Sequence, residues 1–128
     1  MQVLIYKAAL TDLKTNPATS GISPGDVVGL ELGDDGKIAA NALLTRGKWF
    51  FKSTRSLPLG TLEPQATALL SPALERRAHL RVRIVEVEPA HLTRGKVAKV
   101  FISVWGDPED LAPPKAKAQI FSRSRIND

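Results

Sequence analysis

The chain has 128 residues, of which 43% are apolar and 24% are charged, and this is the size and composition of one soluble globular domain. It has no cysteine, which excludes disulfide bonds, zinc sites with thiolate ligands and a cysteine nucleophile. Lys and Arg (18) outnumber Asp and Glu (13), so the net charge is +5 and a polyanion is the favoured class of partner. We find no signal-peptide pattern and no apolar run near the ~18 residues of a membrane helix, and we expect a cytoplasmic protein that does not bind membranes.

The first half of the chain has the alternation and the turns of antiparallel strands. Residues 2–7 are β-like, and residues 8–20, rich in Thr, Asn and Pro, predict a loop with a turn of helix. Segments 27–32 and 37–45 flank the sequence Gly-Asp-Asp-Gly at 33–36, which is typical of a hairpin turn. After a second turn signal at 46–47, residues 48–53 alternate as a strand does. We expect these four strand segments to form an antiparallel meander.

A helical period replaces the strand period after Thr61. Apolar residues at 62, 66, 69, 70 and 74 have helical spacing, Thr61 is placed to cap the helix, and Pro72 is expected to end or kink it near Ser71. The spacing therefore predicts two short helices at 62–70 and 72–79. A second strand pair, 80–88 and 96–105, follows.

Together these elements predict the α+β class. The expected architecture is a small, mostly antiparallel β-barrel or curled sheet over residues 1–110, with a short helical insertion between strands four and five. Residues 111–128 contain two consecutive prolines at 113–114, followed by four cations, and we interpret them as a basic C-terminal tail.

The sequence offers little for catalysis. His79 and His91 are the two histidines, and their spacing fits neither a metal site nor a catalytic triad. Asp34 and Asp35 form a carboxylate pair, but they lie in a turn flanked by glycines, where Asp is favoured because it bonds the local backbone. We expect no enzymatic activity, no cofactor and no bound metal.

Basic and aromatic residues occur together in the middle and late strands. Residues 41–60 have a charge of +4 with no acid, and residues 81–100 add +3. Lys48, Phe50 and Lys52 share one strand face, which places a ring between cations, as in surfaces that bind single-stranded nucleic acid. The alternatives are that Phe50 is a core residue and that the charge only keeps the domain soluble. The candidate nucleic-acid-binding residues are Arg46, Lys48, Trp49, Phe50, Lys52, Arg55, Arg81, Arg83, Lys99 and Phe101.

Several short motifs follow one another between residues 24 and 106. They are Gly-Asp-Val-Val-Gly-Leu at 25–30, Asn-Ala-Leu at 41–43, Leu-Gly-Thr-Leu at 59–62 leading into Gln65 and Ala66, and the strands 81–86 and 100–106. In these motifs and their order, residues 24–106 resemble the HIRAN domain family. This resemblance implies a small barrel of SH3- or OB-like character with inserted helices. It also implies recognition of DNA, since members of the family occur alone in bacteria or fused to helicase-like enzymes of DNA repair.

The sequence leaves three hypotheses for function. The first is a non-enzymatic nucleic-acid-binding module with single-stranded or tailed DNA preferred, accessory to DNA repair or replication and working with a DNA-processing enzyme. The second is a protein-interaction adaptor whose basic tail binds an acidic partner. The third is a subunit whose strand edges pair in a homo-oligomer. Binding of nucleic acid, unlike an apolar adaptor contact, should weaken steeply with salt.

Overall fold

The computed structural model describes residues 1–46, 53–90 and 97–111. In this part of the chain there are six strands and one α-helix, followed by a 3-10 turn, η2 (Pro108–Asp110). The elements are, in chain order, β1 (Gln2–Thr11), β2 (Val27–Leu32), β3 (Ile38–Arg46), β4 (Ser53–Leu62), α1 (Pro64–Glu75), β5 (Arg81–Glu88) and β6 (Lys99–Gly106).

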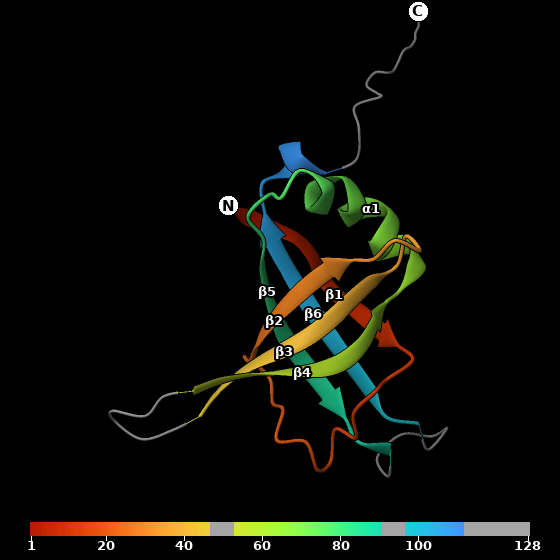
Figure 1. Ribbon diagram of the computed structural model, residues 1–128, viewed down its shortest axis with the longest axis vertical. Helices are drawn as coiled ribbons and strands as arrows, with labels where there is room; N and C mark the ends of the chain where they lie inside the picture. The colour runs from red at the N-terminus through yellow and green to blue at the C-terminus, as the bar shows by residue number, and fades with distance from the viewer. Residues whose placement is uncertain (47–52, 91–96, 112–128) are drawn as a thin grey trace, which may run out of the picture.

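The strands form one antiparallel sheet that closes in a ring. Hydrogen-bonded neighbours follow the order β1–β4–β3–β2–β5–β6, and β6 pairs with β1 to close the ring (Figure 1). This confirms an antiparallel α+β fold with a helix between strands four and five. The predicted meander is wrong in one respect, because among the described strands β1 pairs with β4 and β6 and not with β2.

Two junctions of the ring are short. β2 pairs with β5 at a single position, Val27 opposite Arg83, and β1 pairs with β4 at Leu10 opposite Leu62 and Thr11 opposite Thr61. The other junctions are longer, above all that of β3 with β4. A cavity lies beside the β2–β5 junction and is lined by residues of both strands.

β1 is longer than the sequence predicted. The loop expected from residue 8 is wrong for residues 8–11, which continue the strand, and residues 12–20 contain no helix. Ala8 and Leu10 are buried in the core and hold this part of the chain to its neighbours. The tertiary contacts therefore override the polar composition of the region.

The β2–β3 hairpin confirms the turn prediction. The Asp35 carboxylate accepts a hydrogen bond from the backbone N–H of Lys37 (2.9 Å), and Gly36 has φ +81°, a conformation that favours glycine. Asp35 thus bonds the local backbone, as expected for a turn residue.

β4 was not recognised beyond its first residue. The predicted strand at 48–53 falls mostly on residues 47–52, which lie outside the described part of the chain, whereas the structure has a strand over residues 53–62. The sequence does not predict this strand because it contains Pro58, and proline argues against a strand assignment. It is accommodated at a register shift, where Pro58 is opposite Asn41 and Gly60 is opposite Ala40. Thr61 accordingly lies in β4 and does not cap the helix, whose N-cap is Glu63.

α1 is one helix, so the predicted break at Pro72 is wrong. Pro72 cannot donate to the carbonyl of Ala68, but Ala68 is exposed and its carbonyl can be hydrated. The buried residues Ala66, Leu70 and Ala73 form one stripe on both sides of the proline. Packing of this stripe on the sheet outweighs the lost hydrogen bond.

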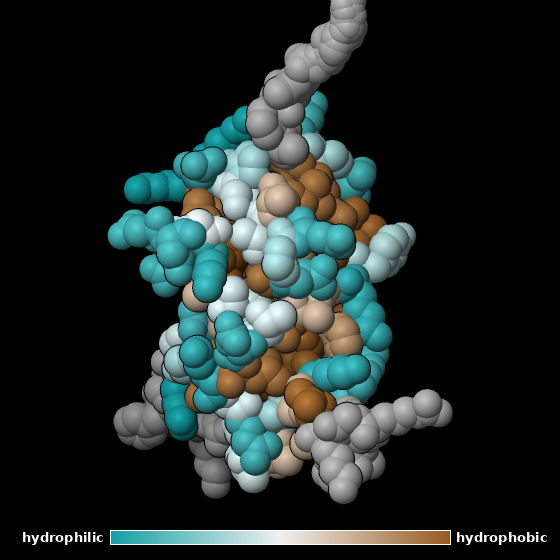
Figure 2. Space-filling view, turned by 90° about the vertical axis from the view of Figure 1, so that its right-hand side faces the viewer, coloured by the Kyte–Doolittle hydropathy of each residue, from teal (hydrophilic) through white to brown (hydrophobic). Residues whose placement is uncertain are grey.

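The core fills the ring and continues under α1. The helix lies at one end of the ring, and the loop between β1 and β2 lies at the other (Figure 1). Half-buried apolar side chains reach the surface in patches that hydrophilic residues border, as the face in Figure 2 shows. The largest fully buried side chains are Ile38, Leu59, Leu62, Leu70, Ile84, Val100, Ile102 and Val104.

Candidate nucleic-acid interface

Two of the predicted binding residues, Arg81 and Arg83, lie on the outer face of β5. They alternate with Val82 and Ile84, which are buried in the core. Because successive side chains of a strand point to opposite faces, the two arginines point away from the core. Arg81 is exposed and Arg83 is half-buried.

An aromatic side chain of β6 lies next to these arginines. In the β5–β6 register Arg81 is opposite Trp105 and Arg83 is opposite Ser103. Trp105 is 40% exposed, while Ser103, on the same outer face, is buried beneath its neighbours. An exposed indole beside a guanidinium provides one group that can stack on a base and one that can contact a phosphate.

A cavity of about 300 Å³ opens beside the arginines at the β2–β5 junction. The Arg83 guanidinium is held there by a hydrogen bond from Nη1 to the carbonyl oxygen of Val82 (3.2 Å). The described residues that line the cavity include three with basic side chains and none with an acidic side chain. The lining residues are Val27, Val28, His79, Leu80, Arg81, Val82 and Arg83.

Phe101 and Lys99, also predicted to bind, lie on β6 in a different environment. The Lys7 ammonium lies 4.4 Å from the centroid of the Phe101 ring and forms an ion pair with Glu86 (2.7 Å). Lys99 is opposite Glu88 on β5. The Phe101 ring is therefore covered on one face, and acids balance the cations around it.

Two bulges create this arrangement. On β1 the register shifts between Ile5 and Ala8, and on β5 it shifts between Ile84 and Glu86. A bulge changes which face the following side chains occupy. Both bulges flank β6, and they bring Lys7 and Glu86 to opposite sides of Phe101, where they pair across the ring.

The Glu86 carboxyl belongs to a short chain of polar contacts on this face. Hydrogen bonds with Glu88 and with Lys7 hold the pKa of Glu86 below its usual value. The same hydrogen bond with Glu86 raises the pKa of Glu88. Glu86 and Glu88 offset the charges of Lys7 and Lys99, so this half of the face offers a polyanion no net attraction.

Arg55 is not brought together with Arg81 and Arg83. It is exposed on β4, and in the ring order two strands separate β4 from β5 in either direction. Arg46 ends β3, where its backbone pairs with Ser53. Lys48, Trp49, Phe50 and Lys52 lie outside the described residues, so the predicted grouping of Phe50 with two lysines stays a prediction.

The candidate list lacks two residues that the structure places beside the arginines, and one exposed ring on β1. His79 is exposed and lines the cavity, and Trp105 is not among the candidates although its alternation with Lys99 and Phe101 indicates the outer face. Tyr6 lies in the β1 bulge and is 81% exposed, which makes it a second accessible ring on the strand next to β6. Only the bulge, which the sequence analysis did not identify, explains this exposure.

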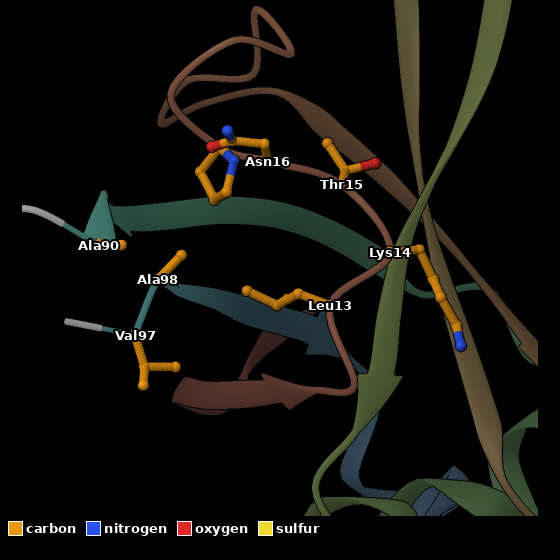
Figure 3. A pocket seen from close by; sticks show the side chains of 8 residues that line it. Leu13, Lys14, Thr15, Asn16, Ala90, Val97 and Ala98 are labelled. Carbon is orange, nitrogen blue, oxygen red and sulfur yellow. The ribbon is translucent and has the colours of Figure 1, made fainter. Parts of the chain in front are cut away.

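Other cavities of the described residues have a different lining. One of about 530 Å³, at the ends of β5 and β6, is lined by residues 13–17, Ala90, Val97 and Ala98, and Figure 3 shows that its side chains are mostly short or apolar. Another, of about 480 Å³, lies between α1, the β2–β3 turn and the end of β1, and has both Asp12 and Lys37 in its lining. Neither combines several cations with an exposed ring as the outer face of β5 and β6 does.

Comparisons of the chain with models of protein families, with curated proteins and with solved structures find no match. Over the described ranges, no three His, Asp or Glu side chains are grouped so as to hold a metal ion. None of the helices in these ranges has the length and apolarity needed to cross a bilayer.

Proposed function

We propose that the chain is a non-enzymatic module that binds single-stranded nucleic acid, preferably DNA, on the outer face of β5 and β6. The observation that carries the proposal is the pairing of Arg81 with the exposed Trp105, next to a cavity lined by Arg83 and His79. We refer to these four residues as the arginine face.

The chemistry of this face supports binding that is tolerant of sequence. A base stacked on an aromatic ring contributes about 1–3 kcal/mol whatever its identity. Guanidinium groups bind phosphate oxygens in a bidentate manner and release counterions, which gives affinity that falls with salt. Glu86 and Glu88 make their half of the outer face less favourable for phosphate groups. The bound nucleic acid is therefore expected to lie at the end of the face that contains Trp105.

Two features of the whole chain agree with the proposal. The net charge of +5 favours polyanions in general. The resemblance of residues 24–106 to the HIRAN family favours DNA as the ligand and an SH3- or OB-like type for the ring of strands. It also favours an accessory role beside a DNA-processing enzyme in the cytoplasm.

The test is fluorescence anisotropy with single-stranded, duplex and tailed DNA and the matching RNA, at low and at physiological salt. Trp105→Ala should weaken binding of single strands by about 5–150-fold for every base sequence, the range that corresponds to one lost stack. Arg81→Ala should weaken binding and reduce the dependence of log K on log salt by about 1.

Two variants serve as comparisons. Lys14→Ala removes one charge near the cavity at the other end of β5 and β6 and should change affinity little. Arg55→Ala probes the β4 side of the ring. If Arg55→Ala weakens binding as much as Arg81→Ala, or if a folded Trp105→Ala protein binds like the wild type, the arginine face is not the binding surface. Binding of a protein ligand that salt leaves unchanged would favour the adaptor function instead.

A further inference from the structure

The cavity at the β2–β5 junction concentrates basic side chains in one place. Binding of a nucleic-acid strand along the outer face of β5 and β6 does not require such a concentration. Arg81, Arg83 and His79 all contribute to the lining of the cavity, and no acidic residue of the described chain does. The Arg81 and His79 side chains form no hydrogen bond or ion pair within the described residues. Arg83 uses one nitrogen on the Val82 carbonyl and retains further N–H groups.

The rest of the lining is apolar. Val27 and Leu80 contribute apolar side chains outside the buried core, whereas Val28 and Val82, which also line the cavity, point into the core. Charges next to apolar walls interact more strongly than charges surrounded by water, because the local dielectric constant is lower. The two guanidinium groups repel each other in such a place, and an anion between them relieves the repulsion.

The backbone fixes the position of the cavity. Val27 and Arg83 form the single pair between β2 and β5, and next to them the Ile84 N–H donates to the Asp26 carbonyl (3.0 Å) and the Gly25 N–H donates to the Ile84 carbonyl (2.7 Å). These bonds anchor Arg83 on one side of the cavity. On the other side the strands are not paired, which leaves the space open to a ligand.

We propose that this cavity binds a phosphate monoester, such as the terminal phosphate of a nucleic-acid strand, in preference to an internal phosphodiester. A monoester carries about −1.5 to −2 charges at pH 7, whereas a diester carries one, so two guanidinium groups favour the monoester. A volume of about 300 Å³ is enough for a phosphoryl group with its sugar. The proposal rests on the function proposed above and adds a preference for phosphorylated ends.

The first experiment compares oligonucleotides of one sequence that carry a 5′-phosphate, a 3′-phosphate or only hydroxyl ends. At least one phosphorylated end should bind about tenfold more tightly than the hydroxyl ends, because the additional charge lies against the guanidinium groups. Arg81→Gln and Arg83→Gln should each reduce this preference to less than about threefold. Lys14→Gln also removes one positive charge, beside the cavity at the other end of β5 and β6, and should leave the preference intact.

The second experiment uses inorganic phosphate and needs no oligonucleotide. Phosphate, added at constant ionic strength, should shift the NMR signals of the Arg83 Nε–H group and of the His79 ring, and Arg81→Gln should weaken this effect. Chloride at the same ionic strength should shift neither signal.

The two experiments separate the proposals. Strands that bind without end preference, together with no response to phosphate, would leave single-strand binding intact and overturn the monoester site. A response to phosphate by a protein that binds no oligonucleotide would support the monoester site and contradict the nucleic-acid function. A preference that Lys14→Gln abolishes as fully as Arg83→Gln would reflect net charge alone and would also overturn the site.

Discussion

The substitution Gly60→Ala tests how closely β1 and β4 approach each other where the ring closes. A Cβ atom at residue 60 would lie 2.5 Å from the carbonyl oxygen of Thr11 and 3.4 Å from that of Asp12. The Thr11 oxygen cannot move freely, because Thr11 pairs with Thr61 and its hydroxyl donates to the Thr61 carbonyl (3.2 Å). Gly60→Ala must therefore displace backbone.

Displacements of this kind cost about 1–3 kcal/mol. For a domain of this size each kcal/mol corresponds to a fall in Tm of about 4 °C, which thermal unfolding followed by circular dichroism can measure. Urea unfolding gives the change in free energy itself. Gly29→Ala is the matched control in β2, since its Cβ would lie 3.7 Å from Leu43 Cδ1, an ordinary contact. It should leave stability unchanged or raise it by up to about 1 kcal/mol. Equal losses for the two variants would show that glycine is needed in the strands for another reason and would refute the steric argument.

Two further predictions concern segments outside the described residues. Phe50→Ala tests whether the predicted group Lys48, Phe50 and Lys52 is a binding surface in addition to the arginine face: if it is, the variant should weaken binding of single strands by about 1–3 kcal/mol for all base sequences while the fold persists, as anisotropy and circular dichroism will show. An unfolded Phe50→Ala protein together with unchanged affinity of Lys48→Ala would mean that Phe50 is a core residue. Truncation at Pro113 should lower affinity and flatten the salt dependence without loss of the cooperative unfolding transition, because the four cations of the tail attract phosphates without selecting a sequence. Loss of that transition would show that the tail is structural.

Much of the sheet could be predicted from the sequence because short-range signals specify it. The segment Val27–Leu32 coincides with β2, and the β2–β3 turn follows from two glycines and two aspartates. β5 and β6 were found within one to three residues, since apolar residues alternate along them. In each case the pattern and the turn chemistry agree with the final fold.

The missed features depend on contacts between distant segments. β1 lies between β4 and β6, which are far from it in sequence, and no local pattern indicates these partners. Pro58 and Pro72 both have local effects that predict a break, yet a register shift absorbs the first and a buried stripe on α1 outweighs the second. A proline in the sequence indicates that one backbone hydrogen bond is lost, but it does not indicate the packing that compensates for this loss.

The candidate site was predicted in part for the same reason. Alternation places Arg81 and Arg83 on the outer face of β5. Strict alternation would also turn Glu86 and Glu88 toward the core, and the change of phase between Ile84 and Val87 is the signal for a bulge at Val85. Without that bulge one cannot foresee the ion pair over Phe101.

The two glutamates on β5 provide a prediction about pH. The pKa of Glu86 is lowered, so its contribution to stability is present above the pKa of the unfolded chain and is lost as pH falls through the folded value. The pKa of Glu88 is raised, so its contribution is present below the unfolded pKa and is lost as pH rises through the folded value. The two contributions overlap near the ordinary pKa of glutamate, about 4.3, where this pair should stabilise the fold most.

Because both carboxyls are exposed to solvent, the effect is best measured through their individual titrations by NMR. Glu86→Gln should return the pKa of Glu88 toward its ordinary value, since the charge that favours protonation of Glu88 is removed. Lys7→Gln, which removes the other partner of Glu86, should raise the pKa of Glu86. A Glu88 titration that Glu86→Gln leaves unchanged would show that the two carboxyls do not interact in solution.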